Sequence, residues 1–302
     1  MRTLLWLMLG LGACSAVKTR QNLRATQAEW TGFSSESLTL GPHTVHHWIG
    51  GEGPTVLLIH GFGADGLATW WPQARHLAKD HRVIVPDLLW FGESSSSAPP
   101  TLDAQAGAIQ ALVDHHVDPG ESVDVVGISY GGFVALRYGS LDPERQRKLV
   151  ILDSPGPLFD SNDQAALLAR FGVDAPEDIF VPKDSEAVRV LIELAYHKPP
   201  PLPDALLRDI QRQVFSAHLD EKTTLLRELE SEAERYQGAQ PAQYTDTLII
   251  WGEHDTVFPL DIGRSLAEHM NAGFLVVEDT AHAPHLERPQ EVNEVLSAFL
   301  KP

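Results

Sequence analysis

The sequence predicts an α/β fold built on a mostly parallel, doubly wound sheet of about eight strands. Short, almost continuous apolar segments alternate with longer amphipathic ones from residue 55 to residue 300. Strands that are apolar along their whole length are buried on both faces, as in a parallel sheet covered by helices. Six such strands are predicted, at 55–59, 82–85, 122–126, 148–152, 247–251 and 274–277. Helices are predicted between and after them, at 68–78, 102–115, 131–141, 260–270 and 289–300.

Two further strands are expected ahead of this pattern. Segments 38–40 and 44–48 alternate between apolar and polar residues more than the later strands do. This alternation is typical of an antiparallel hairpin with one exposed face.

The alternation of strands and helices stops between residues 155 and 241. Over this stretch the pattern is helical only, and the proline-rich segment 198–203 breaks it. Because strands resume at 247, the simplest prediction is a helical cap inserted into one domain that spans residues 31–302. The helices expected in the cap are 164–171, 185–196, 204–216 and 221–236.

The charge balance excludes one class of partner. The chain has 41 acidic and 23 basic residues among 302, for a formal net charge of −18. Nucleic-acid binding requires clustered Lys and Arg, so no nucleic-acid partner is expected. The same balance argues against electrostatic docking on anionic lipid. With 43% hydrophobic residues, the chain has ample material for a core.

The N-terminus predicts export. A basic start and the eight apolar residues 4–11 precede small residues, as in a secretory signal, and a membrane span would need about 20. Residues 11–14 (LGAC) resemble the lipobox of bacterial lipoproteins, and Cys14 is the only cysteine. The resemblance implies a signal peptide over 1–13, lipidation of Cys14 and a membrane-anchored lipoprotein of the bacterial cell envelope. The polar and weakly patterned residues that follow predict a lipidated tether over 14–30. Cleavage after Ser15 or Ala16, or a buried N-terminal segment, are the alternatives.

Three motifs carry candidate chemistry. Residues 127–132 (GISYGG) follow a predicted strand and open a helix, where a G-x-S-x-G turn exposes the hydroxyl of Ser129. A serine hydroxyl needs a base and a third group that orients the base. The segments 252–255 (GEHD) and 281–289 (AHAPHLERP) each follow a later strand. Parallel strands end at one edge of the sheet, so these loops are expected to meet the Ser129 turn.

Together with 60–63 (HGFG), these motifs resemble the α/β-hydrolase fold superfamily, in the capped branch of serine esterases and lipases. The resemblance implies that Ser129 is the nucleophile, His282 the general base and Asp255 the acid that orients it. It further implies an oxyanion hole formed by the backbone N–H groups of Phe62 and Tyr130.

The chain departs from the family pattern at two positions. Segment 87–94 (DLLWFGES) has Trp90 where the family usually has glycine, and Ala281 also replaces a usual glycine. Neither change removes a reacting group.

Several alternatives stay open at this point. His285 or His254 could serve as the base, and Asp153, just past strand 148–152, could serve as the acid. Histidines occur in pairs at 46–47 and 115–116, but no further ligand residue follows either pair at a spacing typical of metal sites. No metal is therefore expected. No glycine-rich phosphate loop is present in the sequence, so no nucleotide cofactor is expected either.

The predicted function is hydrolysis of carboxylic esters, as an esterase or lipase, through an acyl-enzyme. The expected partners are a small-molecule or lipid ester substrate and, through the N-terminal anchor, a membrane. Two alternatives remain. The same triad could serve an aminopeptidase, an acyltransferase or a carbon–carbon hydrolase, or the chain could be a catalytically silent binding lipoprotein.

Overall fold

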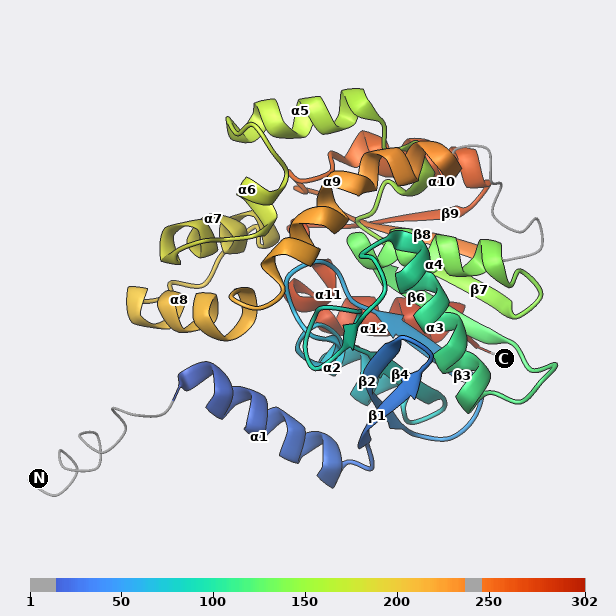
Figure 1. Cartoon of the computed structure of the whole chain (residues 1–302). Helices are drawn as coiled ribbons and strands as arrows, with labels where there is room; N and C mark the ends of the chain where they lie inside the picture. Colours follow the sequence, from blue (N-terminus) through green and yellow to red (C-terminus); the bar gives the residue numbers. More distant parts are fainter. Residues whose placement is uncertain (1–14, 237–245, 302) are drawn as a thin grey trace, which may run out of the picture.

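The computed structural model describes residues 15–236 and 246–301, and its centre is a sheet of nine strands (Figure 1). The strand order is β1-β2-β4-β3-β6-β7-β8-β9, and β5 pairs with β2. The neighbouring strands in the order β4-β3-β6-β7-β8-β9 are all parallel. The three pairs that β2 makes, with β1, β4 and β5, are antiparallel. The strands are β1 (Ser34–Leu40), β2 (His43–Gly50), β3 (Thr55–Ile59), β4 (Arg82–Pro86), β5 (Ser95–Ser96), β6 (Val123–Ile128), β7 (Gln146–Leu152), β8 (Asp246–Gly252) and β9 (Gly273–Val277).

This sheet confirms the predicted α/β class and its mostly parallel order. The eight expected strands all form, within a few residues of their predicted bounds. The ninth, β5, has two residues, too few for any hydrophobic pattern. The central strands β3 and β6 are buried along their whole length, which explains their almost unbroken apolar sequences.

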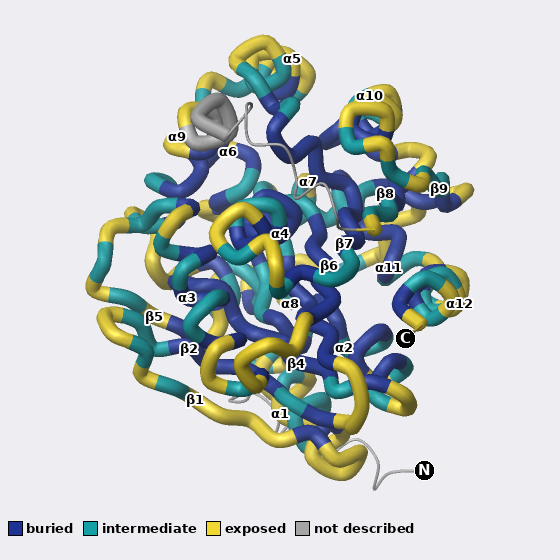
Figure 2. Tube along the Cα trace, turned by 90° about the vertical axis from the view of Figure 1, so that its right-hand side faces the viewer, coloured by how far each residue is buried: buried dark blue, intermediate teal, exposed yellow. Residues whose placement is uncertain are grey.

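Helices cover both faces of the sheet (Figure 2). Successive residues of a strand point to opposite faces, and β3 divides accordingly. Leu57 and Ile59 belong to a core shared with α3, α4 and α10, whereas Val56 and Leu58 belong to one shared with α2 and α12. These five helices are α2 (Gly66–Leu77), α3 (Leu102–His116), α4 (Tyr130–Leu141), α10 (Leu260–Met270) and α12 (Pro289–Phe299).

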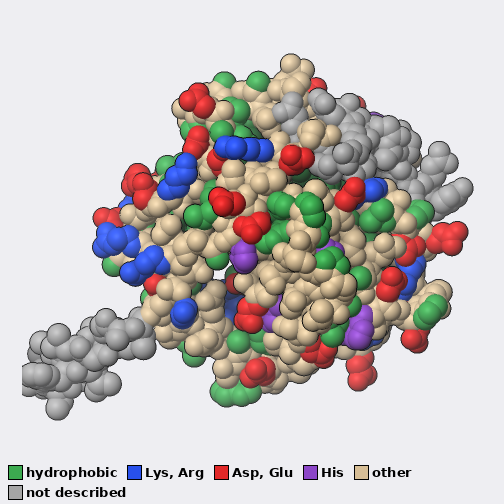
Figure 3. Space-filling model, viewed as in Figure 1, with side chains coloured by type: hydrophobic (Ala, Val, Ile, Leu, Met, Phe, Trp, Pro, Cys, Tyr) green, Lys and Arg blue, Asp and Glu red, His purple; other side chains and the backbone are tan. Residues whose placement is uncertain are grey.

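Between β7 and β8 the described residues form a group of helices. They contact the loops at the carboxyl ends of the strands: a Cβ at Gly63, after β3, would lie 3.0 Å from the Phe215 ring, and Arg170 donates to the backbone oxygen of Thr256, after β8. The helices therefore cover the edge where the candidate residues lie. They are η1 (Gly156–Leu158), α5 (Ser161–Phe171), α6 (Glu177–Phe180), α7 (Ser185–Ala195), α8 (Asp204–Ile210), the π-helical turn η2 (Gln211–Phe215) and α9 (Leu219–Tyr236). On the face shown in Figure 3, basic side chains gather over α7 and α8.

The N-terminal segment differs from the expected tether. Residues after Ser15 form α1 (Ala16–Trp30), and the Ser15 side chain caps it by accepting a hydrogen bond from Lys18 N. The carboxylate of Asp209 in α8 accepts hydrogen bonds from the Ser15 hydroxyl (2.8 Å) and Val17 N (3.0 Å). Within α1 only Ala28 is buried, so no apolar stripe reveals the helix in the sequence.

The predictions for the signal peptide, residues 1–13, and for lipidation of Cys14 lie outside the described residues. Within the described residues, no helix combines the length and apolar character that a membrane crossing requires.

Candidate active site

The turn that carries Ser129 joins β6 to α4 and is strained. Ser129 has a φ of 51°, in the left-handed region that non-glycine residues rarely adopt. Its neighbours must be small, because a Cβ at Gly131 would lie 2.4 Å from the backbone oxygens of both Ile59 and His60. The turn after β6 thus packs backbone to backbone on the end of β3, which holds the serine hydroxyl clear of the sheet.

Gly131→Ala is expected to destabilise the fold by about 3 kcal/mol or more, because the backbone atoms that it meets cannot move aside. Gly107→Ala in α3 is the matched control, since its Cβ would meet nothing within 4 Å. That control should stabilise the fold by about 0.5–1 kcal/mol through helix propensity. Denaturant unfolding of both variants measures the difference, and equal effects would contradict the close approach.

The structure brings the three candidate side chains into one hydrogen-bonded chain. His282 lies in the loop after β9, and its Nε2 is 2.9 Å from Ser129 Oγ. Its Nδ1 is 2.8 Å from Asp255 Oδ2, in the loop after β8. The other oxygen of Asp255 accepts hydrogen bonds from Val257 N (2.7 Å) and Phe258 N (3.1 Å). Asp255 is therefore held rigidly, and its carboxylate fixes which ring nitrogen of His282 faces the serine.

The loop after β3 lies against this serine. A Cβ at Gly61 would come within 3.2 Å of Ser129 Cβ, and the rings of Phe62 and Tyr130 meet edge to face at 5.7 Å. His60 holds the loop: its Nδ1 donates to Gly61 O (2.7 Å) and its Nε2 accepts from Leu88 N (2.9 Å). Burial lowers the pKa of His60, which keeps the ring neutral as this accepting role requires.

Asp153 lies behind Asp255. Its Oδ1 accepts a hydrogen bond from Gly252 N (2.8 Å), and Asp153, Asp255 and His282 each offer an atom within 4.8 Å of the others. Asp153 is fully buried with a φ of 45°. Burial and the nearby charge of Asp255 raise the pKa of Asp153 well above its usual range. His282 is hydrogen-bonded to Asp255, and Asp153 stands beside that pair as a neutral acid.

The other two candidate histidines contact other side chains. His285 is buried against Trp70, with ring centroids 4.8 Å apart, and burial lowers its pKa to about 3. His254 stacks on His197 at 4.1 Å in the neighbouring loop. Of the three candidate bases, the geometry therefore brings only His282 to Ser129.

The fold also assembles a histidine group that sequence spacing does not show. His47 on β2 and His116 at the end of α3 bring their Nε2 atoms to 2.7 Å, and Glu36 of β1 lies 4.0 Å from His47. The short contact fits a hydrogen bond between two neutral rings, since burial and the neighbouring histidines lower the pKa of His47 to about 4. The expectation of no metal stays a prediction.

The chain belongs to the α/β-hydrolase fold family, whose model matches residues 54–289. Its relatives include lipases, which indicates that the protein is a hydrolase. Lipase 1 of Psychrobacter immobilis is 28% identical over 292 residues, covering 94% of this chain and 89% of the lipase. The 2-hydroxymuconate semialdehyde hydrolase of a Pseudomonas species is 29% identical, covering 83% of this chain and 88% of that enzyme. A solved structure described as a membrane phospholipase A is 25% identical with a TM-score of 0.77, covering 99% of this chain and 95% of that one.

Proposed function

We propose that the protein hydrolyses carboxylic esters through an acyl-enzyme on Ser129. The observation that carries the proposal is the hydrogen-bonded chain from Ser129 through His282 to Asp255. His282 Nε2 accepts the hydroxyl proton as Ser129 Oγ attacks the ester carbonyl, and Asp255 stabilises the imidazolium that forms. The same proton then passes to the leaving alcohol, and water releases the acid by the reverse sequence.

The oxyanion of each tetrahedral intermediate needs donors close to Ser129. The backbone N–H groups of Phe62 and Tyr130 belong to the two loops that meet there, and we assign them this role. One such donor contributes about 3–4 kcal/mol of transition-state stabilisation in acyl transfer.

Aromatic side chains around the serine favour an apolar acyl group. Phe62 contacts Phe91 (4.9 Å between centroids) and Phe180 of the cap (6.5 Å), and Phe258 contacts His282 edge to face at 5.6 Å. The lipase and phospholipase relatives point to the same substrate class, esters of fatty acids. We infer that the acyl chain lies along these rings.

We also propose export and anchoring at a membrane through lipidated Cys14, on the resemblance of residues 11–14 to a lipobox. Because α1 begins at Ala16, such an anchor would hold the α1 end of the domain at the lipid surface. This arrangement would present membrane lipids to the enzyme.

The test measures hydrolysis of p-nitrophenyl esters from acetate to palmitate by the full chain, with the Ser129→Ala protein as the blank. Activity above the blank that increases with acyl length is expected. A fluorophosphonate probe that forms a covalent bond with the nucleophile should label the parent chain and spare Ser129→Ala. Labelling without turnover of any ester would refute the ester substrate, and absence of both would refute the nucleophile.

A carbon–carbon hydrolase is the second candidate, because the 2-hydroxymuconate semialdehyde hydrolase relative matches about as well as the lipase. Turnover of 2-hydroxymuconate semialdehyde with no ester turnover would favour it. An aminopeptidase is less well supported, because a cap carboxylate that could bind a substrate amine, Glu177, is already paired with Arg227.

A further inference from the structure

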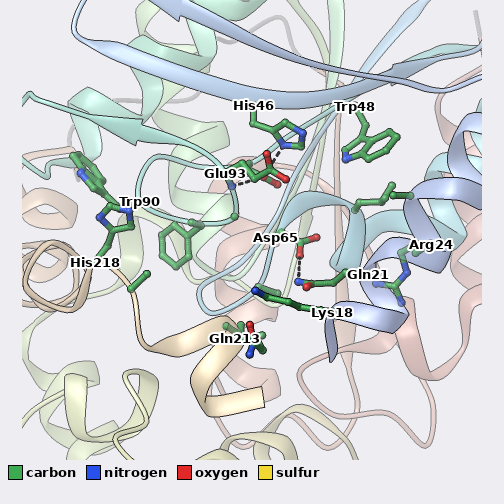
Figure 4. Close-up of a pocket in the computed structure, with 18 of the residues that line it drawn as sticks. Lys18, Gln21, Arg24, His46, Trp48, Asp65, Trp90, Glu93, Gln213 and His218 are labelled. Atoms are coloured by element: carbon green, nitrogen blue, oxygen red, sulfur yellow. Dashed lines mark hydrogen bonds and ion pairs between the residues drawn. The ribbon is translucent and has the colours of Figure 1, made fainter. Parts of the chain in front are cut away.

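A cavity of about 360 Å³ lies between α1, the cap and the loops after β3 and β4 (Figure 4). Phe91 lines this cavity, and its ring contacts Phe62, which in turn contacts Tyr130 beside the nucleophile. Contacts between aromatic rings therefore connect the lining of this cavity to Tyr130, which follows Ser129. No step of the proposed ester chemistry uses the cavity.

Lys222, on α9, is a buried basic residue in the lining of this cavity. Only 3% of its surface is exposed. Its ammonium lies 5.1 Å from the centre of the Phe91 ring, and its hydrogen bond to Val214 O is long, at 3.5 Å. Burial lowers the pKa of Lys222 to about 8, so the amine is still mainly protonated at neutral pH. A buried cation without a counter-ion is costly, and a ligand anion removes that cost.

The basic groups of α1 face the same space. Lys18 and Arg24 both line the cavity from α1 (Figure 4), and Lys222 lines it from α9. Within the described part of the chain, no carboxylate lies within ion-pair distance of Lys18, Arg24 or Lys222. Three cations that form no ion pair within these residues surround one cavity, which favours an anion that can accept hydrogen bonds on several sides.

Two of the carboxylates that line the cavity, Asp65 and Asp87, accept hydrogen bonds from other groups of the protein. Asp87 accepts hydrogen bonds from Gly66 N (2.8 Å) and Glu93 N (3.0 Å) and pairs with His46 (2.8 Å). Asp65 caps α2 through Ala68 N (2.6 Å) and also accepts from Gln21, as Figure 4 shows. These acids therefore stabilise loops, and the charge of Asp65 also favours the charged form of Arg24, whereas neither acid forms an ion pair with Lys222. Glu93, at the exposed rim, is the remaining carboxylate.

We propose that this cavity binds a phosphate group, in the form that a phospholipid head group presents. Phosphate has oxygens on all sides and can be met from α1 and α9 together, and lysine and arginine are its common protein ligands. The cavity lies beside α1, and α1 begins two residues after the proposed lipid anchor at Cys14. Such an anchor would bring the cavity close to the head groups of the membrane. Phosphate binding itself does not depend on the ester chemistry.

The test is calorimetric titration of the full chain carrying Ser129→Ala, which prevents turnover of any lipid. The probes are inorganic phosphate, glycerol 3-phosphate and monomeric dihexanoylphosphatidylglycerol. One saturable site is expected, and Lys222→Met should weaken binding about tenfold or more. Lys183→Met is the matched control, because that lysine is exposed on the cap and paired with Asp178. If the lipid binds more tightly than inorganic phosphate, the phosphate group that the cavity binds belongs to a lipid head group. If the two bind equally, the ligand is free phosphate.

Two measurements separate lost binding from lost folding. Lys222→Met removes an unpaired buried charge, so its melting temperature without ligand should equal or exceed that of the parent. Arg24→Gln, on the opposite wall, should also weaken binding. Absence of saturable binding by all three probes, or equal affinity in Lys222→Met and the parent, would overturn the proposal. Because the titration uses Ser129→Ala, its failure is distinct from a failure to hydrolyse esters.

Discussion

Replacing Ser129 by alanine is expected to lower kcat for ester hydrolysis about 10⁴–10⁶-fold, and His282→Gln should lower it by a similar factor. The two side chains share one proton across 2.9 Å, so either loss stops the same step. For the same reason the double variant should be little worse than either single variant. Steady-state kinetics on the best p-nitrophenyl ester measures all three.

His254→Gln and His285→Gln are the controls for this prediction. Both replace a histidine close in sequence to the triad residues, but neither ring reaches the serine. Each should keep kcat within about tenfold of the parent, although His285→Gln should lower the melting temperature because that ring is buried. A large fall in kcat for His285→Gln at temperatures where it is folded would reassign the base.

Much of the architecture could be predicted because parallel strands and their helices leave strong patterns. The central strands β3 and β6 are apolar throughout, and the motif around Ser129 sits on a strand–turn–helix that only small residues permit. The helix α1 could not be predicted, since it buries a single alanine and depends on Asp209 from a distant segment.

Contacts between residues of different strands and helices also could not be predicted from the sequence. The sequence suggests Asp153 and Asp255 as rival acids, but their proximity depends on β7 and β8 being neighbours in the sheet. Likewise the group of Glu36, His47 and His116 comes from two strands and a helix, and no local spacing shows it. The buried Lys222 looks in sequence like any charged residue of an amphipathic helix.

Asp255→Asn is expected to lower kcat about 10⁴-fold, because an amide no longer fixes the tautomer of His282 or stabilises its charge. The residual activity should depend on Asp153. Once the charge of Asp255 is removed, the carboxyl of Asp153 loses the main charge that opposes its ionisation, and it lies close enough to His282 to replace part of the missing carboxylate. The double variant Asp153→Asn/Asp255→Asn should therefore be about tenfold slower than Asp255→Asn.

Asp153→Asn alone is the control and should cost less than about tenfold, since Asp255 then remains in place. Equal rates for Asp255→Asn and the double variant would contradict a reserve role for Asp153. A loss of about 10⁴ in Asp153→Asn alone would instead make Asp153 the principal acid.

The protonation of Asp153 has its own consequence for stability. Its pKa in the folded protein is raised, so the native state keeps a proton that the unfolded chain releases above about pH 4. Stability from this group is therefore complete at low pH and declines as pH rises towards the folded pKa, by at most about 1.4 kcal/mol per pH unit. Asp153→Asn removes the decline, so its melting temperature relative to the parent should increase from pH 5 to pH 7. A difference that does not change with pH would mean that both carboxyls are ionised, which two buried groups this close to each other do not readily tolerate.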